Sequence, residues 1–206
     1  MKFQTKQELF WEGKFGNQYL KRNRAKSLLV ANRKFFKKIL IKTNKINSII
    51  EFGPNIGINL ILLKKLLKLK KITAVEINKK SCVKLKKINN VEVINESILN
   101  FISNKKYDLV LLRGLLIHIN PKKLNQVYRV IYNSCKKNKY ILFAEYYNPY
   151  PIKVEYRGYK HVLYKRDFAG EFINSFKKIK LIDYGFVYHR DKFPQDDITW
   201  FLPQKK

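Results

Sequence analysis

The chain of 206 residues is 46% hydrophobic, which is enough for one domain with a proper core and excludes a disordered basic tail. No apolar run approaches the roughly 20 residues of a membrane span, and the first residues lack the apolar core of a secretory signal. The two cysteines, Cys82 and Cys135, lie far apart outside any CxxC pattern, so neither a disulfide framework nor a metal site is indicated. We therefore expect a soluble cytoplasmic protein with one domain spanning 1–206, made of a helical lid segment at 1–45 and a core at 46–206.

The formal charge of +29 at pH 7 admits three interpretations. At face value it indicates a polyanionic partner, such as nucleic acid or an anionic membrane. Only eight of the 44 basic residues are arginines, however, and the many lysines accompany abundant isoleucine and asparagine, the three residues that AT-rich codons favour. Compositional drift is therefore the favoured interpretation, and drift that happens to suit a small anionic substrate is the third.

In chain order, the apolar spacing of residues 5–40 predicts helix, and short β-like runs then alternate with helical ones. Strands are expected at NSIIEFG, KITAVEIN, VEVINES, YDLVLLRG and KYILFAEYY. Helices are expected between them at INLILLKKLLKL, KKSCVKLKKI and PKKLNQVYRVIYNSCKK. This alternation predicts an α/β fold, in which a mostly parallel sheet is covered by helices on both faces. KLIDYGFVYHR and ITWFL are expected to add an antiparallel pair at one edge, which makes a sheet of seven strands.

The loop EFGPNIG follows the first strand, beyond the carboxyl ends of the strands, where doubly wound sheets bind ligands. Gly53 allows a sharp turn off the strand, and Gly57 allows the start of the next helix to approach a ligand or the sheet closely. Glu76 comes nineteen residues after Gly57, at the end of the second strand. An acidic residue there can accept two hydrogen bonds from the hydroxyls of a ribose.

The glycines of this loop have the spacing GxxxG rather than the GxGxxG that brings a helix N-terminus to a pyrophosphate. The spacing suits a nucleoside cofactor without phosphates better than a dinucleotide, and a purely structural turn is the remaining alternative. E/DxGxxxG followed by an acid at the end of strand two resembles the pattern of class I S-adenosylmethionine-dependent methyltransferases. The resemblance implies a Rossmann-like fold with S-adenosylmethionine as cofactor. The residues expected to hold the cofactor are Glu51, Gly53, Asn55, Gly57 and Glu76. In these enzymes an acid near the end of the third strand often meets the adenine amino group. Ser97 is the position that aligns with this acid, and Glu96 lies one residue earlier.

Further segments extend the resemblance to nearly the whole chain, from residue 7 to residue 202. They are FWEGKFGNQYLKRN, LLRGLLIHINP, EYYNPYPIKVEYRG, YKRDFAGEF and DYGFVYHRDKFPQDDITWFL. Together they resemble the pseudaminic acid biosynthesis-associated methyltransferases. This resemblance implies a role beside bacterial pathways of nonulosonic-acid sugars, and it does not identify the atom that accepts the methyl group.

In FWEGKFGNQYLKRN, the aromatic residues Trp11, Phe15 and Tyr19 recur every four residues and share one face of a helix. One interpretation is an aromatic stripe that packs the helix onto the domain. The other is a mobile lid, in which Trp11, Tyr19 and Arg22 close over the methionine end of the cofactor together with Asn23.

The segment RGLLIHINP follows strand four and faces the methyl donor, which places Arg113 and His118 near the chemistry. Arg113 is expected to contact the cofactor. Histidine is the usual general base at neutral pH, so His118 is a candidate for this role. The alternatives for His118 are a contact with substrate or cofactor and a structural role among its apolar neighbours. His189, near the end of the chain, is the second candidate for the base.

The exit of strand five and the tail are expected to bind the acceptor, because both lie at the carboxyl end of the sheet. The expected substrate-binding residues are Glu145, Tyr146, Tyr147, Asn148, Arg157, Arg166 and Arg190. Arginine grips carboxylate or phosphate and tyrosine stacks on rings or bonds to hydroxyls, so this set suits an anionic, hydroxyl-rich ligand. The alternative is that the arginines form surface salt bridges, which contribute little to stability.

Together these features predict methyl transfer from S-adenosylmethionine to an oxygen or nitrogen of a nonulosonic-type sugar, which is free, nucleotide-activated or glycan-bound. One rival is an RNA or protein methyltransferase that uses the basic surface to bind its substrate. The other is a protein that binds the cofactor but has lost catalysis. The chain has no basic run interleaved with stacking aromatic residues, which argues against an RNA substrate.

Overall fold

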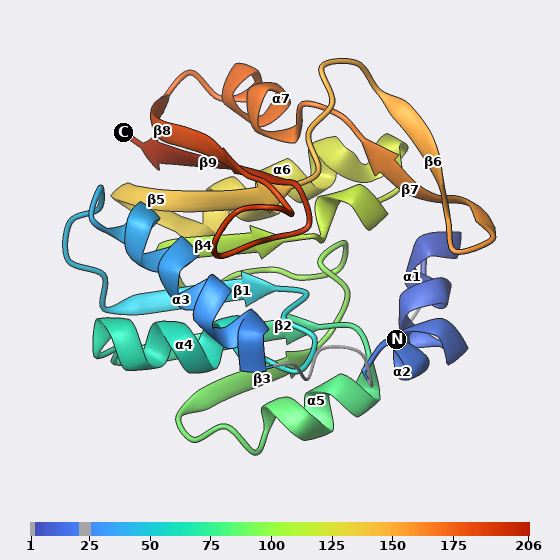
Figure 1. Ribbon diagram of the computed structural model, residues 1–206, viewed down its shortest axis with the longest axis horizontal. Coiled ribbons are helices and arrows are strands. Elements are labelled where there is room, and N and C mark those ends of the chain that lie inside the picture. The colour runs from blue at the N-terminus through green and yellow to red at the C-terminus, as the bar shows by residue number, and fades with distance from the viewer. Residues whose placement is uncertain (1–2, 21–25) are drawn as a thin grey trace.

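In the computed structural model, which describes residues 3–20 and 26–206, a seven-stranded sheet runs through the centre of the molecule (Figure 1). Its strands are β1 (Ser48–Phe52), β2 (Lys71–Glu76), β3 (Val91–Asn95), β4 (Tyr107–Arg113), β5 (Cys135–Glu145), β8 (Ile179–Val187) and β9 (Ile198–Lys205). They lie in the order β3-β2-β1-β4-β5-β9-β8, in which β1 to β5 pair in parallel. β9 runs antiparallel to both of its neighbours. The predicted α/β fold with an antiparallel edge at the C-terminus is thereby confirmed.

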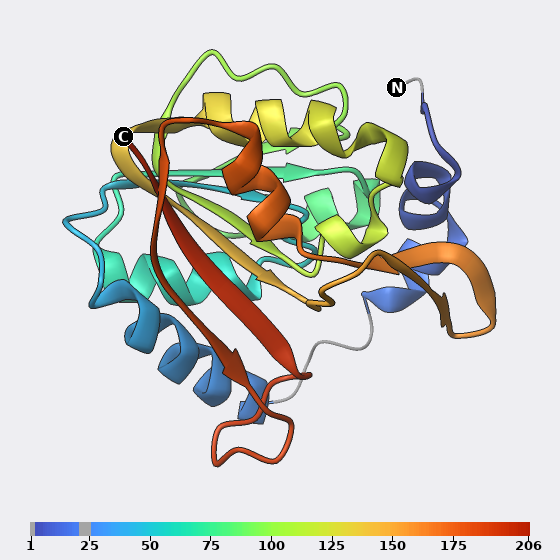
Figure 2. The same ribbon diagram turned by 90° about the horizontal axis from the view of Figure 1, so that it is seen from above.

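Helices cover both faces of this sheet (Figure 2). One face carries α3 (Lys26–Leu40), α4 (Ile58–Leu67) and α5 (Lys79–Leu85), and the other carries α6 (Leu124–Ser134) and α7 (Phe168–Ser175). Along β4, Leu109 and Leu111 are buried on the α3 and α4 side. Val110 and Leu112 alternate with them and are buried on the α6 and α7 side. Successive side chains of a strand point to opposite faces, so a strand covered on both sides is apolar throughout.

The N-terminal segment forms short helices in place of the one helical stretch expected over 5–40. α1 (Lys6–Glu12) and α2 (Lys14–Tyr19) come before α3. A Cβ on Gly16 would lie 1.7 Å from the carbonyl oxygen of Trp11, so only glycine allows the two short helices to join this tightly.

A β-hairpin that the sequence pattern does not predict lies beside these two helices at the carboxyl edge of the sheet (Figure 1). Its strands are β6 (Ile152–Tyr156) and β7 (Tyr159–Lys165). The ring centroids of Phe10 and Phe15 lie 4.9 and 5.5 Å from that of Tyr159. Nε2 of Gln7 also donates a hydrogen bond to the backbone carbonyl of His161 at 2.9 Å. α1, α2 and the hairpin therefore form one structure over the ends of the strands, which we call the cap.

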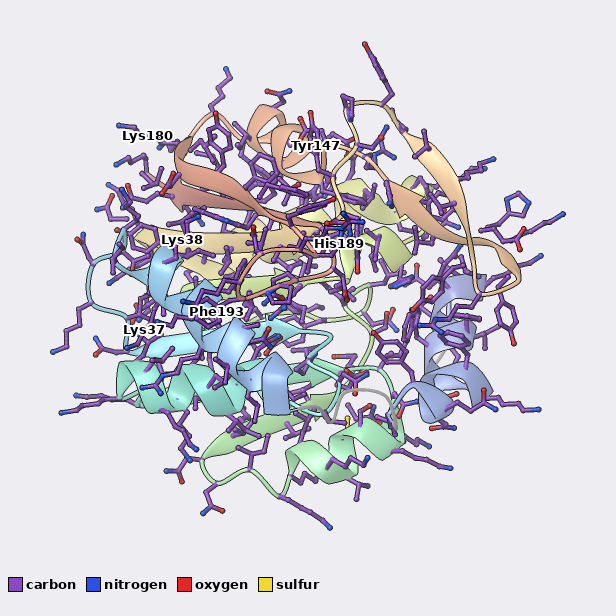
Figure 3. All side chains as sticks on the ribbon, in the orientation of Figure 1. Lys37, Lys38, Tyr147, Lys180, His189 and Phe193 are labelled. Atoms are coloured by element: carbon purple, nitrogen blue, oxygen red, sulfur yellow. The ribbon has the colours of Figure 1, made fainter. Side chains whose placement is uncertain are left out.

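Lys37, Lys38 and Lys180 lie on the outside of the molecule (Figure 3). On α3, Phe36 and Ile39 are fully buried, while the intervening Lys37 and Lys38 are exposed, and Lys180 of β8 is exposed as well. This is the usual arrangement of solvated lysines on an amphipathic element. Among the residues that the structure describes, no helix is both long and apolar enough to cross a membrane.

Candidate active site

A cavity of about 480 Å³ lies at the carboxyl edge of the sheet, next to the cap. The segments that end β1, β2 and β3 contribute Gly53, Glu76 and Ser97 to its wall. Arg113 comes from the end of β4, and Trp11 comes from the cap. Four neighbouring parallel strands thus deliver their ends to one cavity, as the doubly wound topology requires.

Three residues of the loop after β1 have left-handed backbone conformations: Gly53 with φ 67°, Asn55 with φ 53° and Gly57 with φ 81°. Gly53 and Asn55 lie on the cavity wall, and a Cβ on Gly53 would come within 2.9 Å of the Leu115 side chain. Gly57 lies away from the wall, and a Cβ there would come within 2.6 Å of the Ile88 side chain. Gly53 therefore admits the turn beside the cavity, whereas Gly57 allows α4 to start close to the segment after α5.

Glu76 presents a fixed and buried carboxylate at the end of β2. Its Oε2 accepts a hydrogen bond from the amide of Asn55 at 2.8 Å, and its Oε1 accepts one from the amide of Asn78 at 2.9 Å. Burial raises the pKa of Glu76, while these amide hydrogen bonds act in the opposite direction. Each carboxylate oxygen can accept a further hydrogen bond, so the side chain can hold two donors of a ligand in the cavity.

Glu51 of β1 and Arg113 of β4 are joined through the side chain of Asn59. Asn59 Nδ2 donates to Glu51 Oε1 at 2.7 Å, and Arg113 Nη1 donates to Asn59 Oδ1 at 3.0 Å. Arg113 Nη2 donates to the side-chain carbonyls of Asn32, at 2.9 Å, and Gln195. Burial raises the pKa of Glu51 to about 7 and lowers the pKa of Arg113. Arg113 lies on the cavity wall and Glu51 does not, so Glu51 supports the wall from behind.

Ser97 lies on the cavity wall just beyond β3 and is 2% exposed. Its hydroxyl oxygen accepts a hydrogen bond from the amide of Leu99 at 3.2 Å. The neighbouring Glu96 is also on the wall, and its amide donates to the carbonyl of Glu76 at 3.1 Å. The position that aligns with an adenine contact therefore presents a hydroxyl group rather than a carboxylate.

The cap is fastened to the loop after β2 by Asn78. Its Nδ2 donates to the backbone carbonyls of Trp11 and Glu12, at 3.1 and 3.0 Å. Trp11 and Tyr19 both lie on the cavity wall, and their ring centroids are 5.2 Å apart. Arg22, the third residue predicted for this segment, lies outside the described residues, as does Asn23. The aromatic stripe thus packs within the cap, and two of its three residues, Trp11 and Tyr19, also line the cavity.

His118 is 7% exposed and lies on the cavity wall. Its Nδ1 is 3.1 Å from the carbonyl oxygen of Val162, and its ring centroid is 4.5 Å from that of Trp11. A carbonyl oxygen can only accept, so we assign the ring proton to Nδ1, which leaves Nε2 as an acceptor in the neutral imidazole. Burial lowers the pKa of His118 to about 4, and the ring is therefore neutral at physiological pH.

His189 lies on the loop between β8 and β9 (Figure 3). It is not among the residues that line the cavity. Its Nδ1 is 2.9 Å from both carboxylate oxygens of Asp197, and the two side chains are 49% and 46% exposed. Of the two histidines considered for the base, the fold brings only His118 to the cavity.

On the acceptor side, Tyr146 lies on the cavity wall. Nζ of Lys165 stands 5.3 Å from the centroid of the Tyr146 ring, and Lys165, Tyr156 and Asp196 lie on the same wall. The other predicted substrate residues lie outside the lining of the cavity: Glu145, Tyr147, Asn148, Arg157, Arg166 and Arg190.

The contacts of three of these residues account for where they lie. Arg166 Nε is 2.5 Å from the carboxylate of Glu171 on α7. Arg157 occupies the turn of the hairpin, between β6 and β7, with its guanidinium 5.6 Å from the Tyr156 ring centroid. Tyr147 (labelled in Figure 3) is 42% exposed, and its ring centroid lies 6.0 Å from that of Phe201.

A family model described as a methyltransferase domain matches residues 20–202 of the chain. The chain belongs to this family of methyltransferase domains. The predicted enzyme class, a methyltransferase, is thereby confirmed. A comparison with curated proteins finds no match.

Solved structures of methyltransferases share this fold. An S-adenosylmethionine-dependent methyltransferase from Clostridium acetobutylicum ATCC 824 is 13% identical, with a TM-score of 0.67 over 93% of this chain and 97% of its own. The plantazolicin methyltransferase BpumL, in complex with a pentazolic analogue and SAH, is 12% identical, with a TM-score of 0.66 over 97% and 95% of the two chains. The glycopeptide N-methyltransferase MtfA, complexed with S-adenosylmethionine, is 9% identical, with a TM-score of 0.65 over 84% and 87%.

Several polar residues at the active site of this methyltransferase were not predicted from the sequence. Asn32 is buried on α3 and Asn59 is half-buried on α4, and an asparagine among apolar residues is the only signal that the sequence offers for either. Asn78 follows the second strand and caps α5, which is a local role that conceals its contacts with the cap. Lys165 carries no distinguishing signal in a chain this rich in lysine.

Glu145 of the methyltransferase is buried behind the loop after β4. Its Oε1 accepts hydrogen bonds from the amides of Leu115, at 2.9 Å, and Leu116, at 3.0 Å. These amides begin the short 3-10 helix Leu116–His118, so the carboxyl group helps to hold His118 at the cavity. Burial raises the pKa of Glu145 to about 7.

We expect the folding free energy of Glu145→Gln, relative to the wild-type protein, to become more favourable as the pH rises. In the wild type the unfolded chain releases the proton of Glu145 near pH 4.5, whereas the folded protein keeps it until about pH 7. The stability contributed by this group therefore falls across that window, and glutamine has no such proton to lose. The stability of Glu145→Gln relative to the wild type is expected to increase by at most about 3 kcal/mol across this pH window.

Urea denaturation from about pH 5 to about pH 8 measures this difference. The exposed Glu155 of β6 offers a matched control, because Glu155→Gln removes a carboxylate without removing a buried proton. A difference between Glu145→Gln and the wild type that stays constant with pH would contradict the expectation.

Proposed function

We propose that this methyltransferase takes its methyl group from S-adenosylmethionine bound in the cavity. The observation that carries the proposal is the carboxylate of Glu76, which Asn55 and Asn78 hold at the end of β2 on the cavity wall. Its free acceptor positions match the paired hydroxyls of a ribose. The structures of MtfA and BpumL, which share the fold, contain S-adenosylmethionine and SAH respectively.

The polar atoms of the wall support a ligand of this kind. Among the described residues, Glu8 Oε1, Trp11 Nε1 and Asn55 Oδ1 are buried and have no hydrogen-bond partner, and all three residues line the cavity. Buried polar groups in folded proteins are almost always paired, so these atoms indicate a ligand that carries both donors and acceptors. A nucleoside joined to an amino acid meets this requirement.

We further propose that the acceptor is a nonulosonic-type sugar, as the resemblance of the whole chain to the pseudaminic acid-associated enzymes implies. The wall that remains for the acceptor combines a cation, Lys165, with the tyrosines Tyr146 and Tyr156 and the carboxylate of Asp196. Lysine suits the carboxylate of an acidic sugar, while tyrosine and aspartate suit its hydroxyl groups. The cation comes from the hairpin rather than from the arginines expected at first.

In the proposed reaction, bound S-adenosylmethionine supplies an electrophilic methyl group on its sulfonium. The cap and the strand ends align the acceptor for an in-line displacement and exclude water. Nε2 of His118, unprotonated because Nδ1 donates to Val162, takes the proton that the acceptor oxygen or nitrogen loses. Glu145 positions His118 through the loop after β4.

Incubating the protein with methyl-labelled S-adenosylmethionine and host extract tests the proposal. We expect label in the small-molecule or glycan fraction, which survives treatment with nuclease and with protease. Label only in nuclease-sensitive or protease-sensitive material would replace the sugar with an RNA or a protein acceptor. Cofactor binding without transfer to any fraction would favour a protein that has lost catalysis.

A further inference from the structure

Glu8 is held at the start of α1 by a complete set of local hydrogen bonds. Its Oε2 accepts from the amides of Gln4 and Thr5 at 2.7 and 2.8 Å, and from the Thr5 hydroxyl at 3.0 Å. The Thr5 hydroxyl oxygen accepts in turn from the amide of Glu8. This reciprocal pair is a capping box, which satisfies free amides at the helix N-terminus. The local role of Glu8 therefore needs only one carboxylate oxygen.

The second oxygen of Glu8 is left over. Oε1 is buried without a hydrogen-bond partner, Glu8 is 5% exposed, and the residue lines the cavity. A capping glutamate on a surface helix leaves its free oxygen in water, and that environment is absent here. Burying a carboxylate oxygen without a partner is unfavourable, so Oε1 indicates a hydrogen-bond donor of the ligand.

The position of Glu8 in the fold indicates which donor this is. Glu8 accepts a hydrogen bond from the amide of Gln4. The side chain of Gln4 in turn donates to Asn100 Oδ1 at 2.7 Å. Asn100 belongs to the turn that begins at Ser97, since its amide donates to the Ser97 carbonyl at 3.0 Å. The start of α1 therefore lies beside the segment after β3.

That segment borders the part of the cavity where the base of a nucleoside belongs. A ribose held by Glu76 lies at the end of β2, and β3 is the next strand outward in the sheet. Ser97 presents a hydroxyl group there, whose oxygen already accepts from the Leu99 amide. The nearest strand end thus lacks a carboxylate at the position that aligns with an adenine contact.

We propose that Glu8 reads the 6-amino group of the cofactor's adenine through Oε1, so that an acid from the N-terminal helix replaces the one missing at Ser97. The assignment rests on the proposed cofactor. In this assignment, α1 of the cap supplies the hydrogen-bond acceptor that distinguishes an amino group from an oxo group. Glu96 is the only rival carboxylate on this part of the described wall and enters the test as a variant.

Calorimetric titration with S-adenosylhomocysteine and with its 6-oxo analogue, S-inosylhomocysteine, tests the assignment. The wild-type protein is expected to bind the adenine compound about 10- to 100-fold more tightly. Glu8→Gln keeps a side chain that completes a capping box, and its amide can donate to the 6-oxo group. This variant is therefore expected to bind S-adenosylhomocysteine more weakly and to lose or reverse the preference.

Glu12→Gln is the matched control, because it removes one acid from the same helix at a residue outside the cavity wall. It is expected to keep the wild-type preference. An unchanged preference in Glu8→Gln, or a preference lost in Glu96→Gln instead, would overturn the assignment. A wild-type protein that binds neither compound would overturn the proposed cofactor itself, which is a separate result.

Discussion

Replacing Glu76 with alanine is expected to weaken the binding of S-adenosylhomocysteine by about 100-fold or more. A hydrogen bond to a charged group contributes about 1.5–3 kcal/mol, and the carboxylate can accept one from each ribose hydroxyl. The same change leaves the amides of Asn55 and Asn78 without their acceptor, so the loop that shapes the cavity loses its anchor as well. Calorimetric titration measures the affinity, and thermal melting reports whether the variant is still folded.

Glu92 provides the control for this prediction. It lies on β3, pairs with Lys105 at 3.1 Å and has a side chain that is 44% exposed, so Glu92→Ala removes an acid without touching the cavity. Its affinity for S-adenosylhomocysteine is expected to stay within about twofold of the wild type, because exposed ion pairs contribute little. If a folded Glu76→Ala protein bound as tightly as this control, the ribose would have to lie elsewhere.

The second large effect is expected at His118. His118→Ala should lower the turnover number by about 100- to 10,000-fold, which is the usual contribution of a general base, with little change in the affinity for S-adenosylhomocysteine. Initial rates with the acceptor identified by labelling measure it. Because the pKa of His118 is about 4, the ring is already neutral above about pH 5. The wild-type rate should therefore show no inflection from this residue near pH 6.5, the ordinary value for histidine.

Two further variants separate catalysis from packing at this position. His118→Phe keeps a ring against Trp11 but has no nitrogen, so a rate that survives in this variant would assign His118 a structural role. His189→Ala changes an exposed histidine outside the cavity wall and is expected to leave the rate unchanged. A large loss of rate in His189→Ala, together with an active His118→Ala, would identify His189 rather than His118 as the general base.

The frame of the fold was predictable because it depends on local patterns. The continuous apolar run of β4 fits only a strand covered on both faces, and the residues of this run divide between the two sides of the core. The hairpin of β6 and β7 was not predictable in this way. It lies outside the main sheet and most of its residues are exposed or half-buried, so neither a continuous apolar run nor a clean alternation identifies it.

The directions of the predicted substrate-binding side chains could not be predicted from the sequence either. Tyr146 reaches the cavity wall, whereas its neighbour Tyr147 is exposed near Phe201 and Arg166 bonds to Glu171. The direction of each side chain changes where the chain leaves a strand, and periodicity no longer applies there. Lys165 reaches the wall because β7 folds back beside the 3-10 helix that contains His118.

The sequence by itself determined the chain order of the strands of the main sheet and of α4, α5 and α6, together with the turn at Gly53 and its distance from Glu76. Each of these features depends on residues that are close together in the chain. The tertiary structure alone decided that Glu8, Asn78 and Lys165 meet around the cavity with His118, which the sequence already placed near the methyl donor. These residues come from segments far apart in the chain, and their approach depends on how the cap packs against the strand ends. Long-range packing of this kind leaves no repeating signal along the chain, so the acceptor side of the site emerges only once the fold is formed.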